Sequence, residues 1–330
     1  MKRIAILGSN SFSGATCAAV CLEQGIEVLG ASRSPEPARC FLPYRWGAAA
    51  SAGFRFVQAD LNRDLDALLE ALDAFRPEVV VNFAAQSMVG QSWAAPLDWY
   101  RTNVMGLVAL EEALRRRDYL RAFVQASTPE VYGSTTGVVT EAAPFNPTTP
   151  YAASKAAGDF SLLTIHKAYD FPVRFTRAAN VCGPGQQLYR IIPRAIYCIR
   201  AGEKLNLEGG GTAVRAFVHM RDVAAGTLLA ATVGRPGAAY HLSTDERVSI
   251  RELVTRICAA LEVRLEDHVT VAPARLGQDD AYLLDSTRAR TELGWQPRYR
   301  LDDIIAETVA WMHDQWDEIR RQPTAYRHQP

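Results

Sequence analysis

RIAILGSNSFSGA, which spans residues 3–15, decides the fold of this chain. The run at residues 3–7 is apolar after its first side chain and predicts a buried strand, and residues 14–24 predict a helix. The loop between them carries glycines at positions 8 and 14. Backbone N–H groups and the helix dipole at such a helix N-terminus favour a pyrophosphate group. The opening residues therefore predict a dinucleotide site, although a plain strand–turn–helix would have the same pattern.

The alternation of strand and helix continues to about residue 126. Further strands are predicted at residues 27–31, 55–58, 79–83 and 122–126, and further helices at residues 65–75 and 104–117. The strands are apolar throughout, which is typical of a parallel sheet covered by helices on both faces. We therefore predict an α/β fold with a Rossmann-type, doubly wound parallel sheet, whose ligands bind at the carboxyl ends of the strands.

The second half of the chain has a different rhythm. Glycine and proline become more frequent after about residue 175, and the clear helices there lie at residues 250–261 and 301–316. We predict an NAD(P)-binding Rossmann domain over residues 1–175 and a smaller C-terminal α/β substrate-binding lobe over residues 176–330. Some strands of the second part are expected to return to the first sheet.

The composition excludes several classes of protein. Among 330 residues, 36 are Lys or Arg and 36 are Asp or Glu, so neither nucleic acid nor an anionic membrane is an expected partner. No apolar run approaches the roughly 18 residues of a membrane helix. The six cysteines form no C-x-x-C pair, and the six histidines show no metal-ligand spacing. These features predict a reduced, cytoplasmic protein without a bound metal.

Side chains around the first two strands indicate which dinucleotide is bound. Gly8 permits a tight turn and Gly14 permits close packing of helix on strand, whereas Ser11 stands where a third glycine is usual. After the second strand, Ser32 and Arg33 supply a hydroxyl and a cation where an acidic residue would bind the adenosine ribose. This pair favours the 2′-phosphate of NADP(H) over NAD(H), unless Arg33 is only a solvated loop residue.

Two further pairs carry the predicted chemistry. Tyr151 and Lys155 are spaced i and i+4, which places them on one face of a helix. A neighbouring ammonium stabilises a phenolate, so Tyr151 can act as a base. Ser127 and Thr128 follow the strand at residues 122–126, where either hydroxyl could bind the substrate oxygen that is oxidised. Both could also be ordinary turn hydroxyls.

These motifs occur in a combination and order that resemble a known family. The chain is similar to the extended short-chain dehydrogenases/reductases, and within them to the nucleotide-sugar epimerase/dehydratase group. The resemblance spans residues 4 to about 295 and rests on GSNSFSGA, QADL, NFAAQS, NVMG, ASTPEVYGS, PYAASKAAGD, RAANVCGPGQ, RAFVHMRDVA and ARLGQDD.

The resemblance implies a tightly bound, recycled NAD(P), a nucleoside-diphosphate sugar held by residues 176–330, and a homodimer or higher homo-oligomer formed through helices of the first domain. Asp60 suits a hydrogen bond to the adenine amino group, although it could equally cap the following helix. The expected cofactor-binding residues are Gly8, Ser11, Phe12, Ser13, Gly14, Ser32, Arg33, Asp60, Leu61, Phe83, Ala84, Ala85, Asn103, Tyr151 and Lys155.

The residues after Thr128 indicate the reaction. The group's 4,6-dehydratases have Thr, then Asp or Ser, then Glu, and this chain has Thr128, Pro129 and Glu130. Once C4 of the sugar is a ketone, a carboxylate can remove the C5 proton. Pro129 has no side-chain donor, so we expect Glu130 both to take that proton and to deliver it to the leaving C6 hydroxyl. The expected catalytic residues are Thr128, Glu130, Tyr151 and Lys155.

Other reactions on the same scaffold stay open. They are epimerisation of the nucleotide sugar, decarboxylation of a nucleoside-diphosphate uronic acid and 5,6-dehydration, and a non-catalytic NAD(P) sensor is a fourth alternative. The AAQS segment and the Ser32–Arg33 pair resemble the GDP-mannose dehydratases, which favours a GDP-sugar. The expected substrate-binding residues are Gln86, Ser87, Asn180, Arg215 and Arg275.

Overall fold

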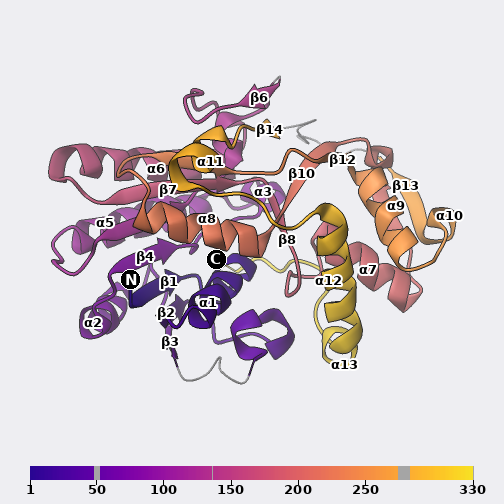
Figure 1. Ribbon diagram of the computed structural model, residues 1–330, viewed down its shortest axis with the longest axis horizontal. Coiled ribbons are helices and arrows are strands. Elements are labelled where there is room, and N and C mark those ends of the chain that lie inside the picture. Colours follow the sequence, from indigo (N-terminus) through magenta and orange to yellow (C-terminus); the bar gives the residue numbers. More distant parts are fainter. Residues whose placement is uncertain (48–52, 136, 274–282, 330) are drawn as a thin grey trace.

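The computed structural model describes residues 1–47, 53–135, 137–273 and 283–329. Its largest element is a seven-stranded sheet in the order β11-β7-β5-β4-β1-β2-β3, in which every pairing is parallel (Figure 1). This order confirms the predicted doubly wound sheet. Its strands are β1 (Arg3–Leu7), β2 (Glu27–Ser32), β3 (Phe54–Gln58), β4 (Val79–Asn82), β5 (Ala122–Ala126), β7 (Val173–Ala178) and β11 (Ala239–Leu242).

Helices cover both faces of the sheet, as the apolar strands require. One core packs helices α1 (Phe12–Glu23) and α8 (Met220–Thr232) against one face. A second core packs α2 (Leu65–Phe75), α5 (Leu107–Leu114) and α6 (Pro150–Tyr169) against the other. The carboxyl ends of the strands stay open between these layers.

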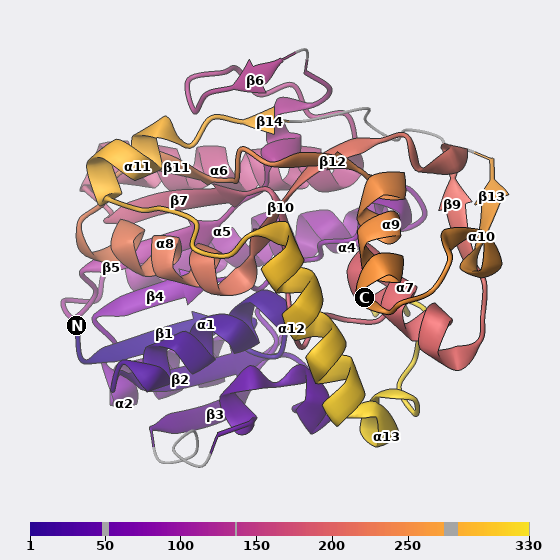
Figure 2. The same cartoon turned by 45° about the vertical axis from the view of Figure 1, so that its right-hand side comes forward.

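A smaller lobe with its own apolar core lies at one end of the sheet (Figures 1 and 2). Its helices are α7 (Ile191–Ala201), α9 (Ile250–Ala260), α10 (Leu265–His268), α12 (Leu301–Asp314) and α13 (Trp316–Ile319). Its strands are β8 (Asn180–Cys182), β10 (Val214–His219) and β12 (Arg247–Ser249) in one sheet, and β9 (Leu205–Glu208) with β13 (Val269–Ala272) in another.

Several segments from the second half of the chain return to the first sheet. Strand β11 pairs with β7, helix α8 covers the sheet, and Trp295, which follows α11 (Thr287–Leu293), packs in the same core. In a separate two-stranded sheet, β14 (Leu283–Leu284) pairs with β6 (Val138–Val139) from the first half of the chain. The boundary between residues 175 and 176 stays a prediction.

The remaining elements are short. They are the α-helices α3 (Val89–Ser92) and α4 (Pro96–Tyr100), the 3-10 helices η1 (Arg39–Phe41), η2 (Pro43–Arg45), η5 (Pro129–Tyr132) and η6 (Gly209–Gly211), and the π-helical segment η4 (Arg101–Gly106). Among the residues that the structure describes, no helix combines the length and the apolar character needed to cross a bilayer.

Two predicted helices begin at other residues than expected. Helix α1 begins at Phe12 rather than residue 14, because the Ser11 side chain caps it by accepting a hydrogen bond from Gly14 N at 3.0 Å. The helix expected at residues 104–117 is α5, which ends at Leu114 and is preceded without a break by α4 and η4. Pro96, at the first turn of α4, suits a helix start because it has no N–H to leave unpaired.

Candidate active site

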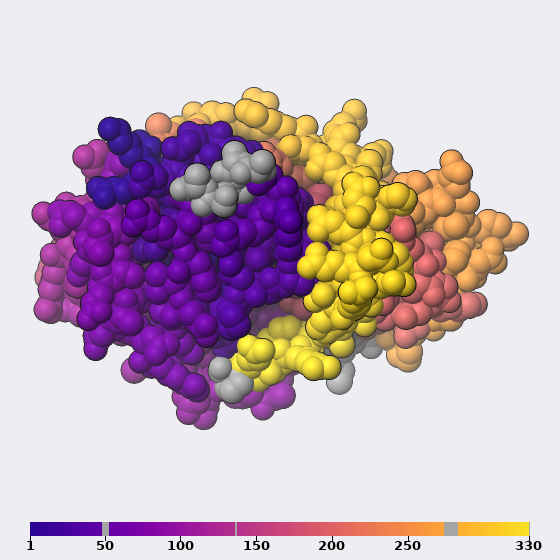
Figure 3. Space-filling model, turned by 90° about the horizontal axis from the view of Figure 1, so that it is seen from below, coloured from indigo at the N-terminus to yellow at the C-terminus, as the bar shows by residue number. Residues whose placement is uncertain are grey.

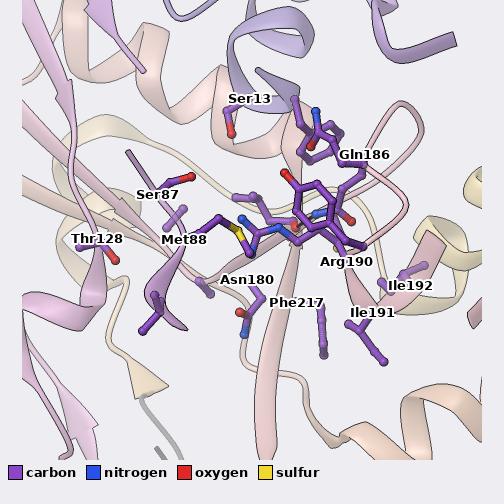
Figure 4. A pocket seen from close by; sticks show the side chains of 18 of the residues that line it. Ser13, Ser87, Met88, Thr128, Asn180, Gln186, Arg190, Ile191, Ile192 and Phe217 are labelled. Carbon is purple, nitrogen blue, oxygen red and sulfur yellow. Dashed lines mark hydrogen bonds between the residues drawn. The ribbon is translucent and has the colours of Figure 1, made fainter. Parts of the chain in front are cut away.

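Two adjoining cavities lie at the carboxyl ends of the central strands. The larger measures about 880 Å³ and extends into the second lobe, and the smaller measures about 190 Å³ beside β2 and β3. Ser11, Phe83 and Ala85 line both, so the two spaces adjoin at the loops after β1 and β4. Figure 4 shows a pocket with Thr128 and Ser87 on one side and Gln186 and Arg190 on the other; all four line the larger cavity.

The glycine loop leaves room for a ligand backbone. Gly8 has φ +79°, and a Cβ there would lie 2.7 Å from Ala84 N. A Cβ on Gly14 would overlap the carbonyl oxygen of Gly8. Ser11 replaces a third glycine and donates a hydrogen bond to Gly8 O at 2.7 Å. The glycine loop therefore keeps the close backbone approach that a dinucleotide pyrophosphate needs, with the Ser11 hydroxyl added, and it fits that group.

The smaller cavity gathers the residues expected at the adenosine end of a cofactor. Ser32 Oγ accepts a hydrogen bond from Asn10 N at 2.9 Å, which fixes this hydroxyl beside the glycine loop. Asp60 Oδ1 accepts one from Asn62 N at 2.8 Å, so this carboxylate also holds the turn after β3. The predicted residues that line this cavity are Gly8, Ser11, Ser32, Arg33, Asp60, Leu61, Phe83, Ala84, Ala85 and Gln86.

Six predicted cofactor residues do not line the smaller cavity, namely Phe12, Ser13, Gly14, Asn103, Tyr151 and Lys155. Phe12 and Ser13 line the larger cavity. Asn103 lines neither cavity among the described residues, because its buried amide exchanges two hydrogen bonds of 2.9 Å with the Gln86 backbone and donates a third to Ser154 Oγ at 3.0 Å. Asn103 therefore positions the loop after β4 against helix α6.

Helix α6 brings Tyr151 and Lys155 to the larger cavity, and both side chains are largely buried. Thr149 caps the helix by accepting a hydrogen bond from Ala152 N at 3.1 Å, and Pro150 occupies its first turn. The Lys155 ammonium donates to Ala126 O at 2.8 Å. Burial lowers the pKa of Lys155 to about 8, with nearby Asp159 opposing and Arg177 reinforcing the shift.

Thr128 and Glu130 border the same cavity at the end of β5. Thr128 caps the 3-10 helix η5 by accepting a long hydrogen bond from Glu130 N at 3.3 Å. Pro129 occupies the first position of this helix, which a residue without an N–H suits. The Ser127 hydroxyl already donates to Asp159 Oδ2 at 2.5 Å. Of the two hydroxyls that the sequence left open, Thr128 is thus the better candidate for a substrate contact.

The predicted substrate residues are distributed unevenly. Ser87 and Asn180 line the larger cavity, whereas Gln86 lines the smaller one. Arg215 lies on β10 and donates to Val214 O at 2.8 Å, and it is not among the described residues that line either cavity. Arg275 lies outside the described residues.

Comparisons with known proteins agree with this geometry. The family model for GDP-mannose 4,6 dehydratase matches residues 6–308. The chain belongs to this family. It is 35% identical over 275 residues to a dTDP-glucose 4,6-dehydratase of Xanthomonas campestris, and the matched region covers 78% of each of the two chains.

Solved structures of this family and of an epimerase share the fold. The crystal structure of DesIV, a dTDP-glucose 4,6-dehydratase from Streptomyces venezuelae with NAD and TYD bound, matches with a TM-score of 0.87 and 31% identity, over 96% of this chain and 98% of DesIV. A UDP-glucose 4-epimerase from Thermotoga maritima matches with a TM-score of 0.84 and 24% identity, over 95% and 99%. The fold alone therefore does not separate a dehydratase from an epimerase.

Sequence reasoning missed the cationic wall of the larger cavity in this member of the dehydratase family. Arg190, Arg194 and Lys204 line it together from the start of α7, its first turns and the loop before β9. Positive side chains suit the diphosphate of a nucleotide sugar. Arg190 and Arg194 are spaced i and i+4 at the start of α7, but only the packing of α7 against β9 brings Lys204 to the same wall.

The tail after α13 was also missed as part of the site. It leaves the second lobe and lies across the first domain, as the yellow segment in Figure 3 shows. Thr324 lines the larger cavity, Tyr326 packs edge-on against Tyr189 with ring centroids 5.5 Å apart, and Gln86 Nε2 donates to Gln329 O at 2.8 Å. Residues 322–329 thus form a strap that passes both cavities.

Proposed function

We propose that this protein is an NAD(P)-dependent nucleotide-sugar 4,6-dehydratase, which makes a 4-keto-6-deoxy sugar from a nucleoside-diphosphate hexose. The observation that carries the proposal is the position of Glu130. This carboxylate borders the same cavity as Thr128, Tyr151 and Lys155, so one substrate can meet an oxidising set and a base together.

Each side chain has one task in this reaction. Tyr151 takes the proton of the sugar C4 hydroxyl, Thr128 hydrogen-bonds that oxygen, and the Lys155 ammonium stabilises the phenolate. Glu130 removes the C5 proton and returns it to the departing C6 hydroxyl, which leaves as water. A bound nicotinamide dinucleotide would supply a reversible hydride acceptor: the hydride that leaves C4 returns to C6 while C5 regains a proton, so the overall reaction is redox-neutral.

Glu130 is the residue to test first. Because Pro129 has no side-chain proton donor, Glu130 has to perform both proton transfers of the elimination. In Glu130→Gln, oxidation at C4 should persist while water loss slows by about 10²- to 10⁴-fold. Transient cofactor absorbance at 340 nm reports the first step, and mass spectrometry reports the second. Glu70→Gln, an exposed carboxylate on α2, is the matched control. Water loss at the wild-type rate in Glu130→Gln would show that another group is the base.

A panel of GDP-, UDP-, dTDP- and CDP-hexoses without added cofactor separates the reaction classes. Loss of one water establishes the dehydratase and shows that cofactor co-purifies. An unchanged mass with a new isomer identifies an epimerase, and loss of carbon dioxide identifies a decarboxylase. Silence across the panel, with a dinucleotide still bound, would favour the sensor. The AAQS motif supports a GDP-sugar as the preferred substrate, which the same panel tests.

We propose NADP(H) as the preferred cofactor. Ser32 and Arg33 border the smaller cavity at the end of β2, a position that suits a 2′-phosphate. Arg33→Ala should lower NADP affinity by about 10- to 100-fold and leave NAD affinity nearly unchanged. Arg63→Ala, an exposed arginine after β3, is the control. Chromatography of cofactor released from the purified protein gives a direct answer, and NAD alone would contradict the preference.

We also propose a homodimer. An apolar face of the helices from α4 to α6 is exposed, with Leu97 and Met105 each 67% and Phe160 54% accessible. Large exposed apolar patches are rare on monomeric proteins and often mark protein–protein interfaces. Met105→Glu should shift the mass measured by light scattering from dimer to monomer, and a wild-type monomer would refute the proposal. A cytoplasmic location stays a prediction.

A further inference from the structure

A buried ion pair lies directly behind the proposed catalytic residues. Asp159 is on α6, one turn after Lys155, and its side chain is fully buried. Asp159 Oδ2 accepts hydrogen bonds from Ser127 Oγ at 2.5 Å and from Arg177 Nη2 at 2.9 Å. The mechanism proposed above uses none of these three residues. A buried carboxylate and guanidinium are costly unless they are paired, so their place behind this site calls for a role.

Asp159 joins the two elements that carry the reaction. Lys155 Nζ donates to Ala126 O at 2.8 Å, and Asp159 accepts from Ser127, the next residue of the chain. Lys155 and Asp159 of α6 are thus hydrogen-bonded to two consecutive residues at the end of β5. Thr128 follows Ser127 directly, so these contacts fix the distance between Thr128 and the helix that carries Tyr151.

One buried carboxylate faces two buried cations beside the proposed catalytic residues. Lys155 and Arg177 are both buried cations, and Asp159 is the carboxylate that faces them. Arg177 also donates to Tyr132 Oη at 2.8 Å, and Tyr132 is hydrogen-bonded to His241 at 2.8 Å. Burial lowers the pKa of His241 to about 3, so that imidazole is neutral near pH 7. Without Asp159, two cations would lie together in an enclosed site.

We propose that Asp159 is a positioning residue, which holds the end of β5 on helix α6 and keeps the buried Lys155 ammonium charged so that it can stabilise the Tyr151 phenolate. The catalytic meaning of this inference rests on the proposed function. The structural part does not, because the charge of Lys155 can be measured without substrate.

The chain has only four lysines, Lys2, Lys155, Lys167 and Lys204, so Lys155 can be titrated directly. Protein labelled with 13C at lysine Cε and loaded with cofactor gives four signals, and the signal missing in Lys155→Met identifies Lys155. Burial places the wild-type pKa of Lys155 at about 8. In Asp159→Asn the midpoint of that titration should move to lower pH, because the opposing carboxylate is gone.

Matched variants separate the charge from the hydrogen bonds. Ser127→Ala removes one hydrogen bond but keeps the carboxylate, so the Lys155 midpoint should stay near its wild-type value. Asp159→Glu also keeps a carboxylate, so its midpoint should lie much closer to the wild-type value than that of Asp159→Asn. Asp159→Asn leaves the buried Arg177 without its carboxylate. If that variant unfolds, Asp159→Asn/Arg177→Gln removes both charges, and the midpoint should still fall because the carboxylate has the larger effect.

Kinetics connect the titration to the reaction. The alkaline limb of the pH profile for cofactor reduction should move with the Lys155 midpoint in Asp159→Asn and stay in place in Ser127→Ala. If the Lys155 midpoint stays at its wild-type value in Asp159→Asn and in Asp159→Asn/Arg177→Gln, the proposed role of Asp159 is overturned. If the midpoint shifts in Asp159→Asn although the wild-type protein converts no nucleotide sugar, the role of Asp159 is upheld and the proposed function is refuted.

Discussion

Replacing His328 by alanine should speed release of the bound cofactor, because this side chain fastens the C-terminal strap. His328 Nε2 lies 2.8 Å from Asp98 Oδ2, and its ring stacks on Trp99 with centroids 5.0 Å apart. Both partners lie on α4 of the first domain, whereas the strap starts after α13 in the second lobe. The contact therefore ties the two lobes together past both cavities.

The magnitude follows from the burial of these groups. The His328 side chain is 25% exposed and Asp98 is 14% exposed, so solvent screens their contact only in part. The ring stack contributes about 0.5–1.5 kcal/mol and the polar contact about 0.5–1 kcal/mol. Together they hold the strap by roughly 1–2.5 kcal/mol, which corresponds to an increase of about 5- to 60-fold in the cofactor release rate when they are lost.

Stopped-flow fluorescence measures this release. Protein loaded with reduced cofactor is mixed with excess oxidised cofactor, and the fall in fluorescence gives the dissociation rate. His313→Ala is the control, since that histidine is 72% exposed and its ring nitrogen lies within hydrogen-bond distance of its own neighbour Asp314. A variant lacking residues 322–330 should release cofactor at least as fast as His328→Ala. Release within twofold of wild type in both variants, with the fold intact, would refute the reasoning.

Three further outcomes test the fold and its electrostatics. Burial lowers the pKa of His241 to about 3 and that of His219 to about 4, so between about pH 6.5 and pH 4 the unfolded chain binds more protons than the folded one. The free energy of unfolding in urea should therefore decrease as the pH is lowered through this window, and His241→Gln should reduce the slope of that free energy against pH. Gly14→Ala should abolish co-purified cofactor, because its Cβ overlaps Gly8 O, whereas Gly90→Ala, with open space around its Cβ, should retain it. Trp295→Ala should cost about 3–5 kcal/mol of stability in calorimetry, since this ring is 1% exposed and donates to Asp222 O at 2.8 Å; a loss below about 1 kcal/mol would contradict the packing described here.

The sequence alone determined the features that depend on neighbours along the chain. Apolar runs interrupted by helices predict a parallel sheet, and five of the seven sheet strands, β1 to β5, lie in the region where this alternation is regular. The same locality explains why Gly8 with Gly14 and Tyr151 with Lys155 could be recognised as pairs. Each of these pairs works through a fixed separation on one loop or one helix.

Only the tertiary structure decided which distant groups share the site. Arg190 and Lys204 meet because α7 packs on β9, and Ser127 meets Asp159 because β5 ends under helix α6. The polar strap around His328 has no periodicity to read, yet it returns to α4 of the first domain. These contacts depend on how whole elements pack, and packing is set by the complementary shapes of surfaces that the order of residues does not display.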